Sequence, residues 1–305
     1  MIQPIQIPRD EFPKSPSKAE GMITLNVKCD NDELTGIRDI EYLERDGIKL
    51  TIQLILPTNR DKKIPLICYI TGSAFHWQDI PSALPRLTYL ANRGIGVASI
   101  QYRASDVAAF PAQVLDIKAG IRYLKEHADE YNFDRDQFFT MGESSGGNVS
   151  LMSGLTTGIE MFEEDIYRKY SSEVKGVIDF YGPTDITRMN DELSTQNHME
   201  ADSPEGYLIG RKNVEENPDL AEPTIVMNYI TKNRELPPVL IVHGTNDELV
   251  PFGQSCMLYE KLKACDKKAV FYAIEGAHHG GPEFWAEQML EIVEKFVKTG
   301  ELDER

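Results

Sequence analysis

Short apolar runs alternate with segments of helical periodicity along most of the chain. The runs have the length and the β-branched or aromatic content of buried strands, and they lie at residues 65–70, 96–102, 138–142, 174–181, 239–243 and 270–274. Apolar residues recur at helical spacing at residues 84–92, 112–127, 145–155, 254–265 and 284–297. This alternation predicts an α/β fold, with a mainly parallel sheet and helices on both faces.

Three segments depart from this rhythm. Residues 1–22 carry four prolines and no periodicity, which predicts an irregular N-terminal arm. Residues 50–56 alternate in the manner of a half-buried strand, and we expect an antiparallel strand or two at one edge of the sheet. The polar, turn-rich stretch at about 187–234 is too long for an ordinary connection, so we expect a partial cap there. We predict a single domain over residues 23–305, with this cap inserted.

Composition narrows the class of protein. The 305 residues are 41% hydrophobic and 27% charged, as in a soluble globular chain. A net charge of −17 repels phosphate backbones and anionic surfaces, so we expect neither nucleic acid nor membrane insertion. The first residues lack the features of a secretory signal, and we expect a cytoplasmic protein. The oligomeric state is open, a homo-oligomer included.

The cysteines point to no metal site. Cys29, Cys68, Cys256 and Cys265 show no metal-binding spacing and are too few for a disulfide scaffold of this length. We expect reduced, mostly structural thiols.

The strongest chemical motif is Gly142-Glu143-Ser144-Ser145-Gly146, between a predicted strand and a predicted helix. A sharp turn there would expose the Ser144 hydroxyl at the edge of the sheet, and the flanking glycines would allow close backbone approach. The start of the helix would supply N–H groups for a developing negative charge. The alternative is an ordinary Gly/Ser-rich start of a helix.

A serine nucleophile needs a base and an acid that orients the base. His278 and His279 both follow the last predicted strand, where catalytic groups of such sheets collect, and we expect one of them to be the base. Asp247 lies in a turn after another buried strand and would hold that histidine, with Glu248 as the alternative. The order Ser, Asp, His along the chain is that of α/β-hydrolases.

The other histidines are assigned minor parts. His127 and His198 are expected to be solvated, His243 to be a core or supporting residue, and His76 could line a pocket. For an oxyanion hole, the loop Cys68–Phe75 follows a buried strand. We assign the backbone N–H groups of Ser73 and Ala74, together with that of Ser145, the alternative being an ordinary turn.

Taken together, these motifs make the chain similar to serine carboxylesterases of the α/β-hydrolase superfamily, in the hormone-sensitive-lipase-like and acetyl-esterase branch. The likeness runs from about Ile40 to Phe296. It includes further segments at Gln101–Arg103, Phe110–Asp116, Asp179–Asp185 and Asn217–Leu220. The loop of that branch that carries its catalytic histidine aligns with His279 and not with His278, so the resemblance favours His279 as the base.

One motif departs from that branch. The branch usually has His-Gly-Gly-Gly in the oxyanion loop, where this chain has Thr71-Gly72-Ser73-Ala74. The added side chains should narrow the acyl pocket and favour small acyl groups, or else the hole is built differently, with the Ser73 hydroxyl as a donor. The histidine that Thr71 replaces usually braces the loop.

The resemblance implies hydrolysis of short-chain carboxylic esters, sugar acetates or aryl esters among them, through an acyl-enzyme intermediate. The catalytic residues would be Ser144, His279 and Asp247, the partner a small-molecule ester, and no cofactor or metal would be needed. Two alternatives remain. One is an amide hydrolase of formamidase or peptidase type on the same triad. The other is a non-catalytic binding protein on this fold.

Overall fold

The computed structural model describes residues 6–27 and 33–302, and the chain divides into two units, residues 1–31 and 32–305. The described residues of the first unit are irregular apart from a turn of 3-10 helix at Arg9–Glu11. The expected end of the arm at residue 22 falls inside this unit, and residues 1–5 of the arm lie outside the described part. The domain boundary therefore stays a prediction.

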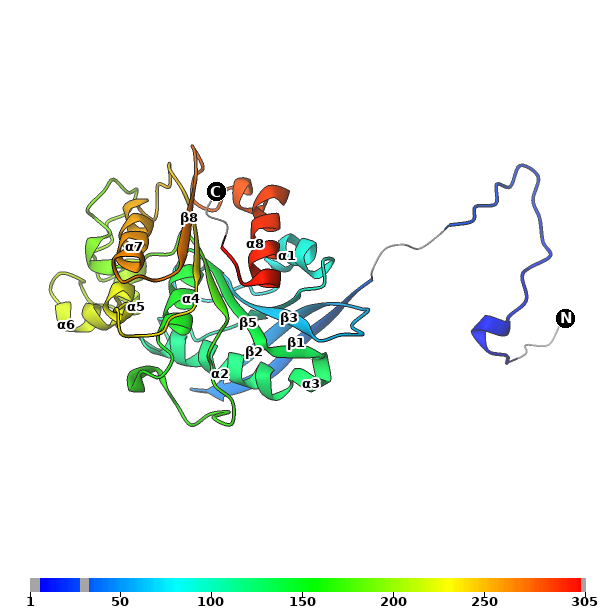
Figure 1. The fold of residues 1–305 in the computed structure, drawn as a ribbon, viewed down its shortest axis with the longest axis horizontal. Helices are drawn as coiled ribbons and strands as arrows, with labels where there is room; N and C mark the ends of the chain where they lie inside the picture. The colour runs from blue at the N-terminus through cyan, green and yellow to red at the C-terminus, as the bar shows by residue number, and fades with distance from the viewer. Residues whose placement is uncertain (1–5, 28–32, 303–305) are drawn as a thin grey trace. The chain divides into compact units, whose positions relative to one another are not determined.

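Within residues 33–302, the chain forms an eight-stranded sheet (Figure 1). In spatial order the strands are β1 (Leu34–Arg45), β2 (Ile48–Pro57), β4 (Gly96–Ile100), β3 (Ile64–Ile70), β5 (Phe133–Glu143), β6 (Gly176–Phe180), β7 (Val239–Gly244) and β8 (Ala269–Ile274). The pairs β1–β2 and β2–β4 are antiparallel, and all other neighbours are parallel. The predicted α/β architecture, with an antiparallel edge, is confirmed.

Helices cover both faces of the sheet, and each face has its own core. One face carries α2 (Ala112–Glu126), α4 (Ser145–Leu155) and α7 (Gly253–Ala264), and the other α1 (Leu84–Ala91) and α8 (Glu287–Thr299). In β3, Leu66 and Cys68 belong to the first core, while Ile67 and Tyr69 belong to the second. Successive side chains of a strand point to opposite faces, so burial on both sides produces the continuous apolar runs of the sequence.

The segment between β6 and β7 contains only short helical pieces. These are η3 (Ile186–Arg188), α5 (Pro204–Leu208), α6 (Pro218–Ala221), η4 (Glu222–Thr224) and η5 (Val226–Tyr229). Elsewhere, short helices include α3 (Ala128–Tyr131), η2 (Glu160–Phe162) and η6 (Pro282–Trp285). The last helix was expected from residue 284 but begins at Glu287, because Ala286 is extended and separates it from the 3-10 turn Pro282–Trp285. In the described part of the chain, no helix has both the length and the apolar character to cross a bilayer.

The cysteines that the structure describes are free thiols. Cys68 and Cys265 are buried and Cys256 is half-buried, while Cys29 lies outside the described residues. Burial raises the pKa of Cys68 to about 12, which keeps this thiol protonated and unreactive.

Candidate active site

Parallel strands bring the predicted site residues to one edge of the sheet. Ser73 follows β3, Ser144 follows β5, Asp247 follows β7 and His279 follows β8. The carboxyl ends of parallel strands meet at a common edge, so loops that are far apart in the sequence become neighbours there.

Ser144 occupies the sharp turn between β5 and α4. Its φ of 53° and ψ of −128° lie outside the regions that non-glycine residues ordinarily adopt. A Cβ added to Gly142 would stand 2.0 Å from the carbonyl oxygen of Gly146, and one added to Gly146 would stand 2.1 Å from that of Ile70. Only glycine fits at either position, which confirms the predicted close backbone approach around the serine.

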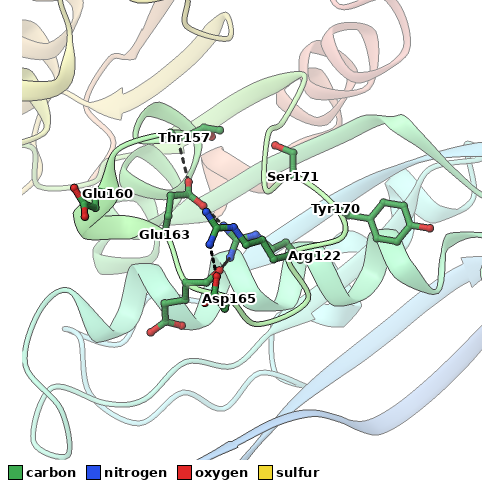
Figure 2. A pocket seen from close by; sticks show the side chains of 10 residues that line it. Arg122, Thr157, Glu160, Glu163, Asp165, Tyr170 and Ser171 are labelled. Carbon is green, nitrogen blue, oxygen red and sulfur yellow. Dashed lines mark hydrogen bonds and ion pairs between the residues drawn. The ribbon is translucent and has the colours of Figure 1, made fainter.

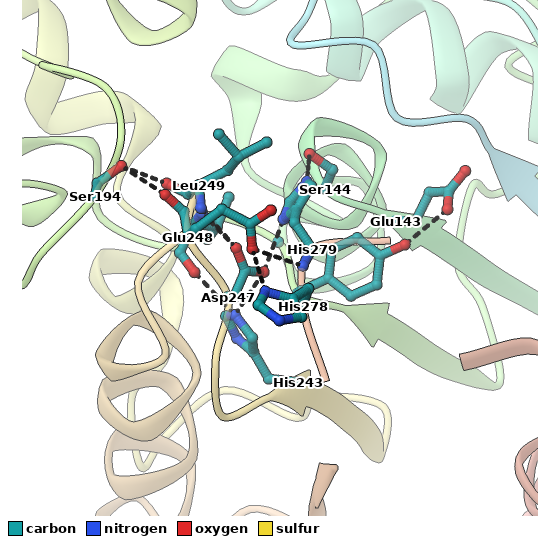
Figure 3. Close-up of polar contacts among 12 residues, drawn as sticks. Glu143, Ser144, Ser194, His243, Asp247, Glu248, Leu249, His278 and His279 are labelled. Carbon is teal, nitrogen blue, oxygen red and sulfur yellow. Dashed lines mark hydrogen bonds and ion pairs between the residues drawn. The ribbon is translucent and has the colours of Figure 1, made fainter. Parts of the chain in front are cut away.

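Ser144, His279 and Asp247 form a continuous chain of hydrogen bonds (Figure 3). His279 Nε2 lies 3.0 Å from Ser144 Oγ, and His279 Nδ1 lies 2.7 Å from Asp247 Oδ2. A carboxylate only accepts hydrogen bonds, so Nδ1 carries the proton and the lone pair of Nε2 faces the serine hydroxyl. This is the arrangement in which a histidine can take the proton of a serine.

Both carboxylate oxygens of Asp247 accept hydrogen bonds. Its Oδ1 accepts the backbone N–H groups of Leu249 and Val250, both at 2.9 Å, and its Oδ2 is within hydrogen-bond distance of two imidazoles, those of His243 and His279. Burial by itself raises the pKa of Asp247, but the hydrogen bonds from the two histidines outweigh it and hold this pKa well below its usual range. The group therefore stays a carboxylate.

His243 supports this carboxylate from within the core. The side chain is fully buried, and its Nε2 lies 3.2 Å from Asp247 Oδ2 and 3.0 Å from the carbonyl oxygen of Val250. Because both are acceptors, Nε2 donates, and Nδ1 at 2.8 Å accepts from the hydroxyl of Ser255. The expectation of a core or supporting histidine is confirmed.

Tyr181 fixes the ring of His279, a contact that sequence reasoning missed. The two ring centroids are 4.8 Å apart in an edge-on arrangement, and the Tyr181 hydroxyl donates to Glu143 Oε2 at 2.8 Å. Tyr181 comes directly after β6, at a strand end like the other site residues, and this position was the available signal.

The two alternatives from the sequence, His278 and Glu248, pair with each other (Figure 3). His278 Nδ1 lies 3.1 Å from Glu248 Oε2, and the His278 side chain is 68% exposed. The carboxylate that meets the His279 ring belongs to Asp247, whereas the contact of Glu248 with His279 is to the backbone N–H and not to the ring.

The loop after β3 packs against the turn that carries Ser144. The N–H of Ser73 donates to Ser145 Oγ at 2.9 Å, so this predicted oxyanion donor is occupied in the structure. The Ser73 hydroxyl binds the carbonyl oxygen of His76 at 2.8 Å and lies 3.2 Å from the Tyr102 hydroxyl. These bonds brace the loop, whereas the hydroxyl of Thr71 has no partner among the described residues.

Two of the three assigned backbone donors are free. No described group accepts a hydrogen bond from the N–H of Ala74 or Ser145. Both residues line the cavity that also holds Ser144 and His279.

The remaining histidines test the minor assignments. His198 was expected to be solvated, which is wrong, because it is only 3% exposed and binds the buried Glu205. Periodicity gave no sign of that contact, since it depends on how the segment between β6 and β7 folds back. His76 packs on the ring of Tyr207 at 4.8 Å instead of lining the cavity, and His127 is partly exposed beside Glu130.

The cavity at Ser144 is small, about 60 Å³. It is lined by Ala74, Phe75, Ser144, Ser145, Pro183, Gln196, His198, Pro204, Glu205, Leu249, Val250 and His279. One wall comes from the sheet domain, and the other comes from the segment predicted to be a cap.

A larger hollow of about 750 Å³ lies beyond the far end of α4 from Ser144 (Figure 2). Its lining includes Arg122, Glu163 and Asp165, and contains none of the predicted site residues. Glu163 is bonded to Arg122 and, at 3.2 Å, to the buried Lys118. Arg122 and Glu163 thus bind each other in this hollow, and the predicted catalytic residues lie in the cavity at Ser144.

Comparisons with known proteins agree with this geometry. The family model described as BD-FAE matches residues 52–262. Esterase LipC of Mycobacterium tuberculosis is 26% identical over 221 residues, which cover 72% of this chain and 53% of that protein. A probable isoprenylcysteine alpha-carbonyl methylesterase of Arabidopsis thaliana, ICMEL1, is 26% identical over 79% of this chain and 50% of its own length. The chain thus spans about half the length of these curated relatives.

Solved structures extend the likeness. A truncated carbohydrate esterase from gut microbiota has a TM-score of 0.79 and 28% identity, covering 88% of this chain and 96% of that one. The propionate-bound esterase Est2 of Thermogutta terrifontis has a TM-score of 0.69 and 23% identity, over 90% of this chain and 97% of that one, and shows a shared fold.

Proposed function

Because the chain belongs to the BD-FAE family, we propose that it is a serine carboxylesterase that hydrolyses short-chain carboxylic esters. The observation that carries this proposal is the unbroken chain of hydrogen bonds from Ser144 Oγ through His279 to Asp247. The esterases among its relatives support the same activity.

In the proposed reaction, Ser144 Oγ attacks the ester carbonyl while His279 Nε2 takes the hydroxyl proton. Asp247 holds His279 and stabilises the imidazolium that forms. The carbonyl oxygen becomes negative and would be bound by the free N–H groups of Ala74 and Ser145. His279 then returns the proton to the leaving alcohol, and a water molecule attacks the acyl-enzyme by the same route. We assign Ser73 the role of holding Ser145 rather than that of a third donor.

The size of the cavity supports a small acyl group. The cavity holds residues that would meet both the acyl group and the alcohol part, so its small size favours an ester with a short acyl chain. The similarity to a carbohydrate esterase favours acetylated sugars over aryl esters as the natural substrate class. The cytoplasmic location and the oligomeric state stay predictions.

Steady-state hydrolysis of p-nitrophenyl esters from acetate to octanoate, by the purified protein and its Ser144→Ala variant, tests this function. We expect the highest kcat/KM for acetate or propionate, and no measurable rate for the variant. Equal rates in the two proteins would exclude Ser144 as the nucleophile. Turnover of p-nitroanilide amides but not of esters would favour the amide hydrolase.

A further inference from the structure

A second histidine–carboxylate pair lies in the wall of the cavity that holds Ser144. His198 Nδ1 is 2.9 Å from Glu205 Oε2, and both side chains are 3% exposed. Both residues belong to the segment between β6 and β7, and both line the cavity. The proposed mechanism does not use this pair.

The contacts of His198 make the pair ionic. Its Nε2 lies 3.0 Å from the carbonyl oxygen of Leu249 and 2.9 Å from the hydroxyl of Ser194, which itself donates to the Leu249 carbonyl. With acceptors at both ring nitrogens, the imidazole is best satisfied when both carry protons. Burial lowers the pKa of His198, but the hydrogen bond and the charge of Glu205 outweigh it and raise the pKa.

Only one oxygen of Glu205 is used by the protein. Oε2 binds His198, and Oε1 has no partner among the described residues. This oxygen keeps contact with solvent although its residue is largely buried, and the residue lines the cavity, so the oxygen can accept a hydrogen bond from a bound molecule. The imidazolium already balances the charge, so a neutral donor completes the site better than a cation does.

The position of the pair indicates which part of a substrate it meets. His198 is bonded to the carbonyl of Leu249, two residues after Asp247, so the pair lies on the same side as the acid and the base. The leaving oxygen of an ester must also lie on that side, because it takes its proton from His279 Nε2. An alcohol part on that side of Ser144 would extend toward Glu205.

We propose that Glu205 is a specificity-determining residue that accepts a hydrogen bond from a hydroxyl group on the alcohol part of the ester. This inference rests on the proposed esterase function and names the residue that would recognise a hydroxylated alcohol part. His198 is the positioning residue that neutralises Glu205 and holds it in place.

Two acetates of matched length test the inference. Glycerol 1-acetate and propyl acetate share the acyl group and a three-carbon alcohol but differ by two hydroxyl groups, and acetic acid release can be followed by pH-stat. We expect the wild-type protein to prefer glycerol acetate, and Glu205→Gln to lower the ratio of the two kcat/KM values about 10- to 100-fold. Gln can still accept from His198 while it places a neutral amide nitrogen at the position of Oε1.

Glu200→Gln is the matched control. It removes the same charge from the same segment, but Glu200 is exposed, binds Asn197 at 2.8 Å and does not line the cavity. The ratio should stay at its wild-type value in this variant. An unchanged ratio in Glu205→Gln, or an equal loss on both acetates, would overturn the inference and leave the esterase function standing. Failure of the wild-type protein on every ester would overturn both.

A measurement on the unmodified protein covers the case in which Glu205→Gln does not fold. During turnover of p-nitrophenyl acetate, an added alcohol competes with water for the acyl-enzyme. The alcohol oxygen bonds to the acetyl carbon while its proton passes to His279, and the acetyl–Oγ bond then breaks as His279 returns that proton to Ser144 Oγ. Glycerol should accept acetyl groups at about tenfold lower concentration than 1-propanol, and equal efficiency would contradict a hydroxyl subsite.

Discussion

Two histidine–carboxylate pairs face the same cavity, and they differ in what the outer nitrogen of each imidazole meets. In His279–Asp247 that nitrogen, Nε2, faces the hydroxyl of Ser144, which has a proton to give. In His198–Glu205 it faces the carbonyl oxygen of Leu249, which has none, and a hydroxyl that already donates to that carbonyl. The first pair can act as a base, and the second can only hold a charge in place.

The comparison teaches that a histidine beside a carboxylate is not by itself a catalytic feature. Both pairs are short, at 2.7 Å and 2.9 Å, and both are largely buried. Whether the histidine can act as a base depends on the group that faces its outer ring nitrogen. The carboxylates differ too, because Asp247 has both oxygens engaged while Glu205 retains one free oxygen at the cavity.

The largest effect should come from removal of the nucleophile, Ser144, or the base, His279. We expect Ser144→Ala and His279→Ala each to lower kcat on p-nitrophenyl acetate about a thousandfold or more, with little change in Tm, because the two groups act as a unit. His278→Ala is the matched control, since that side chain is 68% exposed and binds Glu248. A loss in His278→Ala as large as that in His279→Ala would reverse the assignment of the base.

Removing support from Asp247 should have a smaller and pH-dependent effect. The asparagine of His243→Asn is too short to reach Asp247, so the pKa of this carboxyl should rise and kcat should fall about tenfold. As the pH is lowered, the loss of activity should begin at a higher pH than in the wild-type protein. His243→Gln can place an amide nitrogen near the position of Nε2 and should recover part of the rate. A pH–rate profile of each variant separates this role from simple destabilisation, which would leave the profile unshifted.

The second pair should affect stability more than chemistry. His198→Asn leaves Glu205 buried without its counter-charge, and we expect the free energy of unfolding to fall by about 3 kcal/mol in urea titrations. On p-nitrophenyl acetate, which has no alcohol hydroxyl, kcat should fall no more than about tenfold. A thousandfold loss would make this histidine as important to the chemistry as His279 and would end the distinction between the pairs.

The smallest effect concerns a buried carboxyl that has no histidine. Asp179 lies under the start of α4, with Oδ1 accepting the N–H of Gly182 at 3.0 Å and Oδ2 without a partner among the described residues. Burial raises its pKa from 3.8 to about 8. Between those values the folded chain holds a proton that the unfolded chain has released, so the free energy of unfolding falls as the pH rises.

Asp179→Asn removes this titration. The Tm of the variant minus that of the wild type should become more positive by a few degrees from pH 5 to pH 8, as measured by calorimetry. Asp202→Asn, at an exposed position, should show no such trend. A constant difference for Asp179→Asn would mean that Asp179 is already ionised in the folded protein.

Local geometry explains why Ser144, Asp247 and His279 could be predicted from the sequence. The turn at Ser144 needs glycine at 142 and 146 because backbone atoms come close together there. Both glycines lie within two residues of Ser144, so the requirement is visible as a short sequence motif. The apolar runs locate the strand ends that carry Asp247 and His279. Buried strands and the long helices were predictable for the same reason, since each has its own period.

Contacts between distant irregular segments could not be predicted in this way. His198 meets Glu205 and Leu249 only because the segment after β6 folds back on the loop after β7. The bond from the Ser73 N–H to Ser145 Oγ likewise joins two loops whose spacing is set by the whole sheet. Neither contact has a period or a motif of its own.

The backbone of the loop after β3 has a consequence for engineering. Ala74 and Phe75 hold φ values of 53° and 63°, and a left-handed conformation costs a non-glycine residue about 1 kcal/mol. Glycine at position 74, which lines the cavity, would remove this strain and the β-carbon together. The same residue thus links the backbone strain of the loop to the width of the site, so that a single substitution there changes both.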